Sequence, residues 1–247
     1  MKHWLSLVCL LLLLLLFAAV PLPAADVLEQ ADAFYAQGGA DNYLKAIALY
    51  EQALSAQPDD YTANWKCARA NRDYGNKAKK NGTEGWKDLC ATYGKKAMAY
   101  AAKAVELAPD KVEGQYYYGL SVGVYSDGVS IFTALSEGLK DKTQTSFEAA
   151  YRLDKNYNKG GPILSLARFW AVLPWPLKDK DKSLEYYQEF QATPFFADNA
   201  EAYVFMAELL RDIGGAENRT EATGLLEKAA ASDDTYYADW AKRLLKK

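Results

Sequence analysis

The residues whose chemistry is most suggestive are arginines with aromatic neighbours. The chain has seven arginines, and four of them fall at helical spacing on segments that we expect to share one face. A guanidinium is a planar, permanently charged fork that binds carboxylates in a bidentate manner. These arginines therefore define a candidate binding groove for an acidic peptide tail or another anionic ligand, made of Trp65, Arg69, Arg72, Tyr116, Arg168, Glu208 and Arg211. The alternative is that the arginines form surface ion pairs with Glu113, Glu201 and Glu208, which contribute little.

The residues needed for common catalytic chemistry are missing. His3 is the only histidine, and it lies directly before an apolar N-terminal run. Serine and cysteine hydrolase triads and histidine metal sites are therefore not expected, and the sequence contains no HExxH, GxSxG or Walker motif. Net charge is −3, so the chain lacks a basic surface typical of nucleic-acid binding. We expect no enzyme activity, no cofactor, no metal and no nucleic-acid partner.

Helical repeats are the elements that must position the groove. The segments 42–60, 93–110 and 145–157 share alanines or an aromatic three or four residues apart, and the first two end in proline. Such spacing places the small and large residues on one helix face, where two helices can approach closely. Weaker copies occupy 183–190 and 222–229. Earlier helices are predicted over 62–74, 115–124, 163–172 and 202–213, with Ala68, Gly119, Ala167 and Ala207 as their small residues.

This pattern resembles the tetratricopeptide (TPR) repeat. We predict an all-α, TPR-like right-handed superhelix of about five irregular helix pairs, closed by a capping helix over 236–247. The spacing between copies exceeds the roughly 34 residues of a plain TPR. The extra length lies at 76–86 and 125–142.

The N-terminus predicts export. Lys2 precedes an apolar run from Trp4 to Val20, and small residues follow up to Ala25. This order is typical of a secretory signal peptide. We expect a signal peptide over 1–25, a single repeat domain over 26–247, and a periplasmic or secreted protein. The alternative is an uncleaved segment that anchors the protein in the inner membrane, which would be its only membrane contact.

One segment carries a more specific resemblance. Residues 156–190 read NYNKGGPILSLARFWAVLPWPLKDKDKSLEYYQEF, and their GGP and LPWP elements resemble the extracytoplasmic T-component of TRAP transporters. That resemblance implies a helical accessory protein that docks onto a solute-binding partner. The chain departs from the family in having no lipidation motif.

The LPWP turn is a second candidate docking site, formed by Pro174, Trp175 and Pro176. An exposed tryptophan in a rigid turn can anchor a protein interface. Packing of Trp175 over the neighbouring helix pair is the alternative, and we favour it.

Cys67 and Cys90 are candidates for a disulfide, because exported proteins meet an oxidising compartment. If Ala68 faces Ala97, the numbers of facing residues add up to 165, and the two cysteines are offset by about 12 Å. That offset exceeds the roughly 7 Å limit between bonded Cα atoms. The insertion at 76–86 could change the register, so both outcomes stay open.

The leading hypothesis is an exported TPR scaffold that binds a protein partner, with a TRAP-type solute-binding protein as one candidate. The alternative is a periplasmic carrier of a small hydrophobic or anionic ligand in a closed helical cavity. The sequence leaves homo-oligomerisation open.

Overall fold

The computed structural model describes residues 24–246, and α-helices account for 81% of them, without any strand in this range. The all-α prediction is confirmed. The helices are α2 (Ala24–Gln37), α3 (Ala40–Ala56), α4 (Tyr61–Asn81), α5 (Trp86–Leu107), α6 (Val112–Gly128), α7 (Ile131–Ser136), α8 (Leu139–Asp154), α9 (Tyr157–Val172), α10 (Lys180–Gln191), α11 (Ala200–Ile213), α12 (Ala216–Ala230) and α13 (Thr235–Leu245).

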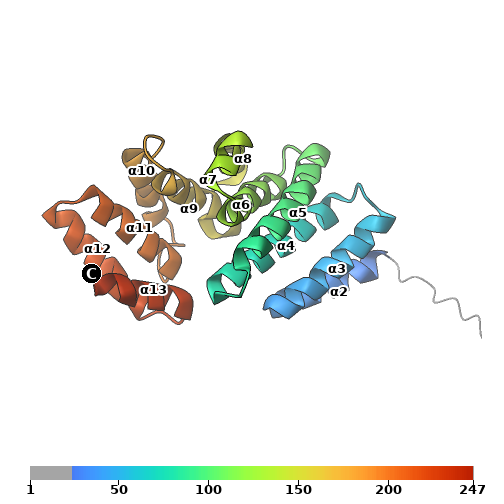
Figure 1. Ribbon diagram of the computed structural model, residues 1–247, viewed down its shortest axis with the longest axis horizontal. Helices are drawn as coiled ribbons and strands as arrows, with labels where there is room; N and C mark the ends of the chain where they lie inside the picture. Colours follow the sequence, from blue (N-terminus) through green and yellow to red (C-terminus); the bar gives the residue numbers. More distant parts are fainter. Residues whose placement is uncertain (1–23, 247) are drawn as a thin grey trace, which may run out of the picture.

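The helices pack in consecutive pairs that follow one another along a curved superhelix (Figure 1). The pairs are α2 with α3, α4 with α5, α6 with α8, α9 with α10, and α11 with α12. Helix α13 then covers α12 and α11 at the C-terminal end. This arrangement of five helix pairs and a capping helix agrees with the predicted architecture.

Small residues allow the close helix contacts. Ala97, Ala101 and Ala104 of α5 are fully buried. A Cβ atom on Gly94 would lie 2.6 Å from the backbone nitrogen of Tyr125, so the backbones of α5 and α6 touch there. Larger side chains at these positions would force the helices apart.

The two predicted insertions have different structures. The first does not form a loop, because α4 and α5 simply extend into it and reach 21 and 22 residues. Gly82 ends α4 in the left-handed conformation that glycine adopts without strain. The second insertion holds α7, a six-residue helix that begins after the capping side chain of Ser130.

The disulfide is not formed: Cys67 and Cys90 are both free and buried. The Cys90 thiol donates a hydrogen bond to the carbonyl oxygen of Gly75 at 3.3 Å. The numbers 75 and 90 add up to 165, so the long hairpin keeps the predicted register. Cys67 lies two helical turns from Gly75 on α4, out of reach of Cys90.

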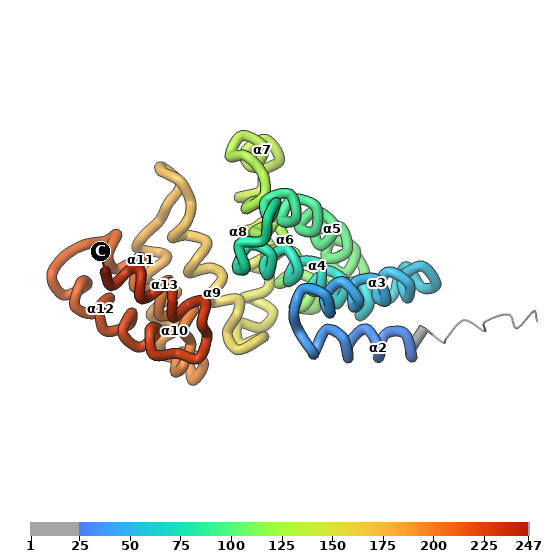
Figure 2. Tube along the Cα trace, turned by 60° about the horizontal axis from the view of Figure 1, so that its bottom comes forward, coloured from blue at the N-terminus to red at the C-terminus, as the bar shows by residue number. Residues whose placement is uncertain are grey.

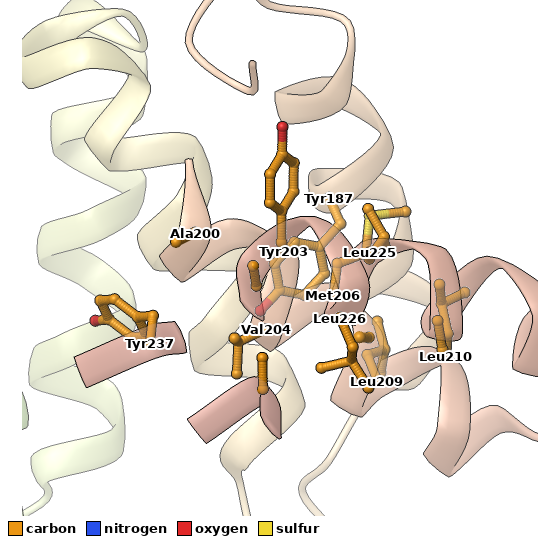
Figure 3. Packing of buried hydrophobic residues seen from close by; sticks show 14 of the residues in the cluster. Tyr187, Ala200, Tyr203, Val204, Met206, Leu209, Leu210, Leu225, Leu226 and Tyr237 are labelled. Atoms are coloured by element: carbon orange, nitrogen blue, oxygen red, sulfur yellow. The ribbon is translucent and has the colours of Figure 1, made fainter. Parts of the chain in front are cut away.

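The largest core cluster lies in the C-terminal part of the chain, between α10, α11, α12 and α13 (Figure 3). Tyr187, Met206, Leu210 and Leu226 are among its most deeply buried side chains. This cluster holds α13 in place, because Tyr237 of α13 packs into it and is only 3% exposed.

The GGP element, Gly160-Gly161-Pro162, follows a bend between α8 and the helical part of α9. Asn158, Lys159 and Gly160 have φ angles of 47°, 60° and 75°. A Cβ atom on Gly160 would lie 2.8 Å from the Phe190 ring, so the bend packs directly on α10.

The predicted signal peptide lies almost entirely outside the described residues. Only Ala24 and Ala25 belong to the structure, and they form the start of α2. Within residues 24–246, none of the helices combines the length and the apolar character needed to cross a membrane.

A cavity on the concave face

The concave side of the superhelix forms a half-open cavity of about 510 Å³. Residues of α4, α6, α7, α8, α9, α11 and α13 line it, so it draws on helices from the second pair to the C-terminal cap. Small-molecule sites in proteins typically measure about 300–1,000 Å³. The cavity is therefore large enough for a small ligand or a short peptide segment.

One side of the cavity is apolar. Its wall comes from α6, α8, α9 and α11, with Leu120, Leu139, Phe147, Phe169 and Phe205 among its members. Leu139, Phe147 and Phe169 are themselves buried in the core. The wall is thus the inner surface of the packed repeats and is fixed in shape before any ligand binds.

The cavity also carries positive charge. Five basic residues of the described chain line it, and all of them except Lys80 are paired with a carboxylate: Arg72, Lys79, Lys80, Lys140 and Arg168. Lys79 forms an ion pair with Asp127 at 2.6 Å, and Arg168 forms one with Glu208 at 2.8 Å. The Arg168 guanidinium also lies 4.0 Å from the centre of the Phe205 ring. These two cations hold neighbouring helices together.

Arg72 and Lys80 are less completely satisfied. Arg72 donates from Nη1 to the Asp73 carboxylate at 2.6 Å, but its buried Nε has no hydrogen-bond partner. Lys80 forms no ion pair within the described chain. Instead its Nζ lies over the rings of Tyr236 and Tyr237, and burial lowers the pKa of its ammonium group. Arg72 and Lys80 therefore both face the cavity, which the carboxylate of Glu201 also lines.

Two residues of α6 shape the space. Tyr116 is 5% exposed and fills the gap left by Gly161, and burial raises the pKa of its hydroxyl to about 12. Gly123 lines the cavity, and a Cβ atom there would meet nothing within 4 Å. Gly123 is therefore the position from which a larger side chain would enter the cavity.

The predicted groove residues do not form one strip. Arg72, Tyr116 and Arg168 share the cavity. Arg69 lies outside its lining, between the rings of Tyr35 and Trp65 at 3.7 Å and 4.9 Å from their centres. The predicted groove residue Trp65 also stacks on Tyr117, with ring centres 5.7 Å apart.

The two remaining groove residues serve the helix packing. Arg211 donates from Nη1 to the carbonyl oxygen of Leu244 at 2.8 Å, which satisfies the last turn of α13. Glu208 is the ion-pair partner of Arg168. Of the seven predicted residues, three line the cavity and four lie beside it.

Sequence reasoning missed Lys79, Lys80 and the tyrosines of α13. The lysines lie on the extension of α4, in the stretch predicted to lie between helices. The signal was nevertheless present, because the pattern of Ala68, Gly75 and Ala78 continues the buried face of α4 into the insertion.

The prediction that Trp175 packs over the neighbouring helix pair is wrong, because Trp175 is 90% exposed. Pro174 and Pro176 flank it in a turn that extends away from the helices, so Trp175 has no neighbour to cover it. Phe132 of α7 is 80% exposed, and both segments project from the same side of the molecule (Figure 2). The docking interpretation of this turn therefore stays a prediction.

No cluster of three or more His, Cys, Asp or Glu side chains that could hold a metal ion occurs in residues 24–246.

Comparison with solved structures defines the class of protein. The fold is similar to TTC0263, a TPR protein of Thermus thermophilus, with a TM-score of 0.64, 19% identity, and coverage of 91% of this chain and 100% of that chain. The MamA protein gives a TM-score of 0.53 at 16% identity, with coverage of 89% and 94%. YrrB, described as a TPR protein with an unusual peptide-binding site, gives 0.50 at 15%, with coverage of 90% and 92%. The chain is thus a TPR-type helical repeat protein.

A family model narrows this class. The model described as "Regulator of microtubule dynamics protein 1-3" matches residues 27–159, and the chain belongs to this family. The match covers α2 to α8 and the start of α9. No curated protein matches the chain. The resemblance to the TRAP T-component finds no support in these comparisons.

Proposed function

We propose that this protein is a scaffold that binds a partner through the concave cavity and carries out no catalysis. The observation that carries the proposal is the cavity of about 510 Å³, with an apolar wall on one side and Arg72 and Lys80 on the other. Its TPR-type fold supports a role in protein interaction. The ligand segment that fits is apolar along most of its length and bears one acidic group.

The charges of the site support this partner chemistry. A carboxylate placed beside Arg72 would accept a charge-assisted hydrogen bond from its guanidinium, which lines the cavity. Charge-assisted hydrogen bonds of this kind contribute about 1.5–3 kcal/mol each. The apolar wall would remove the rest of the segment from water, which adds affinity in proportion to the buried area.

The test is a comparison of three chains as baits. Wild type, Gly123→Phe and Gly224→Phe are used to capture proteins from the source cell. Gly224 of α12 is the matched control, because a Cβ atom there also meets nothing within 4 Å and the residue lies outside the cavity. A partner that wild type and Gly224→Phe retain, and that Gly123→Phe loses, supports the proposal. Equal retention by all three contradicts it.

A second candidate function is carriage of a small amphipathic anion. The partly enclosed shape of the cavity favours it, because Lys80 and the tyrosines of α13 narrow the side that an open TPR groove would leave free. The apolar wall would hold the body of such a ligand, and Arg72 and Lys80 its charged group. Native mass spectrometry of the purified protein tests this candidate: a bound small anion should be present in wild type and absent in Gly123→Phe.

The compartment and the wider role belong to the same proposal. The apolar run from Trp4 to Val20 supports export, either with cleavage or with anchoring at the membrane. The family takes its name from regulators of microtubule dynamics, and a scaffold that binds a protein partner is compatible with a regulatory role. The accessory role in TRAP-type uptake rests only on the GGP and LPWP segment, and the cavity does not require it.

N-terminal sequencing of the chain purified from its source tests export. A mature protein that begins near Asp26 supports cleavage of the signal, and a protein that retains residues 1–25 in a membrane fraction supports the anchor. Retention of residues 1–25 in a soluble fraction contradicts both.

A further inference from the structure

A helix of the second pair and the C-terminal capping helix meet across the cavity. Lys80 lies in the last turn of α4, and its Nζ is 5.0 Å from the ring centre of Tyr236 and 4.4 Å from that of Tyr237, both on α13. In a solenoid each repeat ordinarily contacts only its neighbours. Helices α5 to α12 separate α4 from α13 in the chain, so this contact is not part of the repeat packing.

We propose that the contact of Lys80 with Tyr236 and Tyr237 is a latch, which closes the superhelix around the cavity and controls the entry and exit of ligand. The proposal rests on the cavity being the binding site. It concerns how the site is reached, and it assigns Lys80 a role that the repeat architecture does not need.

The aromatic half of the latch is rigid. The Tyr237 hydroxyl donates a hydrogen bond to Glu201 of α11, and the Tyr237 ring stacks on Trp240 with an interplanar angle of 15°. Phe205 of α11 packs edge-on against the same ring. The receiving surface therefore belongs to the C-terminal core and moves with it.

The cationic half is anchored at its base. Lys79, the preceding residue, pairs with Asp127 of α6, which fixes the end of α4 on the next helix pair. Lys80 is turned toward α13 and forms no ion pair within residues 24–246. The carboxylates of Glu201 and Asp234 attract Lys80 without forming an ion pair with it, so its contact with the two rings is the direct interaction between α4 and α13. The lowered pKa of its ammonium group agrees with this buried position.

The contact forms part of the cavity wall, because Lys80, Tyr236 and Tyr237 all line the cavity. A cation over aromatic rings is a weak interaction compared with the buried core of either half. It can therefore break while the helix pairs stay folded. Opening at this point would widen the concave side, since curvature of a solenoid follows from small rotations between successive repeats.

The test measures the distance between the two ends directly. Spin labels are placed on the full chain at Glu84→Cys, in the turn after α4, and at Asp239→Cys of α13; both positions are exposed. Cys9→Ser removes the remaining cysteine outside the described residues, and Cys67 and Cys90 are buried and unreactive. The variants are Lys80→Met, which keeps the chain length and removes the charge, and Lys80→Arg, which keeps the cation. Lys77→Met is the control, because Lys77 lies on the same helix outside the cavity lining.

We expect one narrow distance distribution in wild type, Lys80→Arg and Lys77→Met, and a longer, broader one in Lys80→Met. The same distribution in Lys80→Met and wild type would overturn the latch. If Lys80→Met does not fold, Tyr236→Leu replaces it, because Tyr236 is only partly buried and meets the same ammonium group.

Control of ligand exchange has its own readout. Anilinonaphthalene sulfonate, a small aromatic anion, serves as the probe, and its release is followed by stopped-flow fluorescence. We expect release from Lys80→Met to be at least fivefold faster than from wild type or Lys77→Met. If the distance between the spin labels lengthens in Lys80→Met but the probe is released at the wild-type rate, the latch does not control ligand exchange. If Gly123→Phe binds the probe as wild type does, the cavity proposal fails, and the distance measurement still decides whether the latch exists.

Discussion

Gly119 of α6 and Phe147 of α8 touch so closely that a Cβ atom at position 119 would lie 2.5 Å from Cε1 of Phe147. Phe147 is 5% exposed and forms part of the cavity wall. The distance between the two helices of the third pair therefore depends on the missing side chain of Gly119.

Replacement of Gly119 by leucine should lower the free energy of unfolding by about 1–3 kcal/mol through overpacking. Urea unfolding followed by circular dichroism measures this change. Gly123→Leu is the control, because Gly123 lies one turn further along α6 and its Cβ would meet nothing within 4 Å. An unchanged midpoint for Gly119→Leu would contradict the tight contact between α6 and α8.

The sequence predicted the pairing of helices because small residues recur at positions where backbones must approach. Gly119, Ala68, Ala97 and Ala167 were all expected at such contacts, and the three alanines are fully buried. The register of the second hairpin also followed from them. Contacts between neighbouring repeats are local in sequence, so residue spacing is enough to identify them.

The cavity depends on contacts that cannot be predicted from the spacing of residues in the sequence. Lys80 and Tyr237 are distant in sequence and meet only because the superhelix curves through several helix pairs. Small rotations between pairs accumulate, and single-sequence patterns do not specify them. The expectation for Trp175 failed for a related reason, because packing of a turn depends on whether the next pair lies beneath it.

The thiols of Cys67 and Cys90 should be unreactive in the folded protein. Both side chains are fully buried, and burial raises the pKa of the Cys90 thiol to about 11, so little thiolate is present near neutral pH. Ellman titration without reductant should detect neither of these two cysteines before unfolding and both afterwards. A protein that retains its N-terminus contributes one further thiol, from Cys9. Absence of both after unfolding would show a disulfide and contradict the register.

Arg69 should contribute to stability, because it lies between two aromatic rings. Arg69→Ala removes its contacts with Tyr35 and Trp65 and should lower the free energy of unfolding by about 1–2 kcal/mol. Arg152→Ala is the control: Arg152 is exposed, and its change should stay within about 0.5 kcal/mol. If both variants were as stable as wild type, the contacts of Arg69 with the two rings would not contribute to stability, and the prediction would be contradicted.

Stability should fall at alkaline pH. Burial raises the pKa of Tyr116 from its ordinary value near 10 to about 12. The unfolded chain therefore ionises first, so the contribution is fully present below pH 10 and is lost as the pH rises through 12. For Tyr116 the loss amounts to about 3 kcal/mol. Urea midpoints of wild type should decrease over this range, and Tyr116→Phe should show a smaller decrease. An identical pH dependence of the two proteins would exclude Tyr116 as a contributor.

The central claim is that ligand binds inside the concave cavity, and filling the cavity tests it most directly. Gly123→Phe places a ring in the space that Arg72, Lys80 and Phe147 surround, while Gly224→Phe adds the same ring on the outside of α12. Affinity for anilinonaphthalene sulfonate, measured by fluorescence titration of the folded proteins, should fall at least tenfold in Gly123→Phe and stay at the wild-type value in Gly224→Phe. Equal affinity of all three proteins would contradict the claim and place the binding site elsewhere on the molecule.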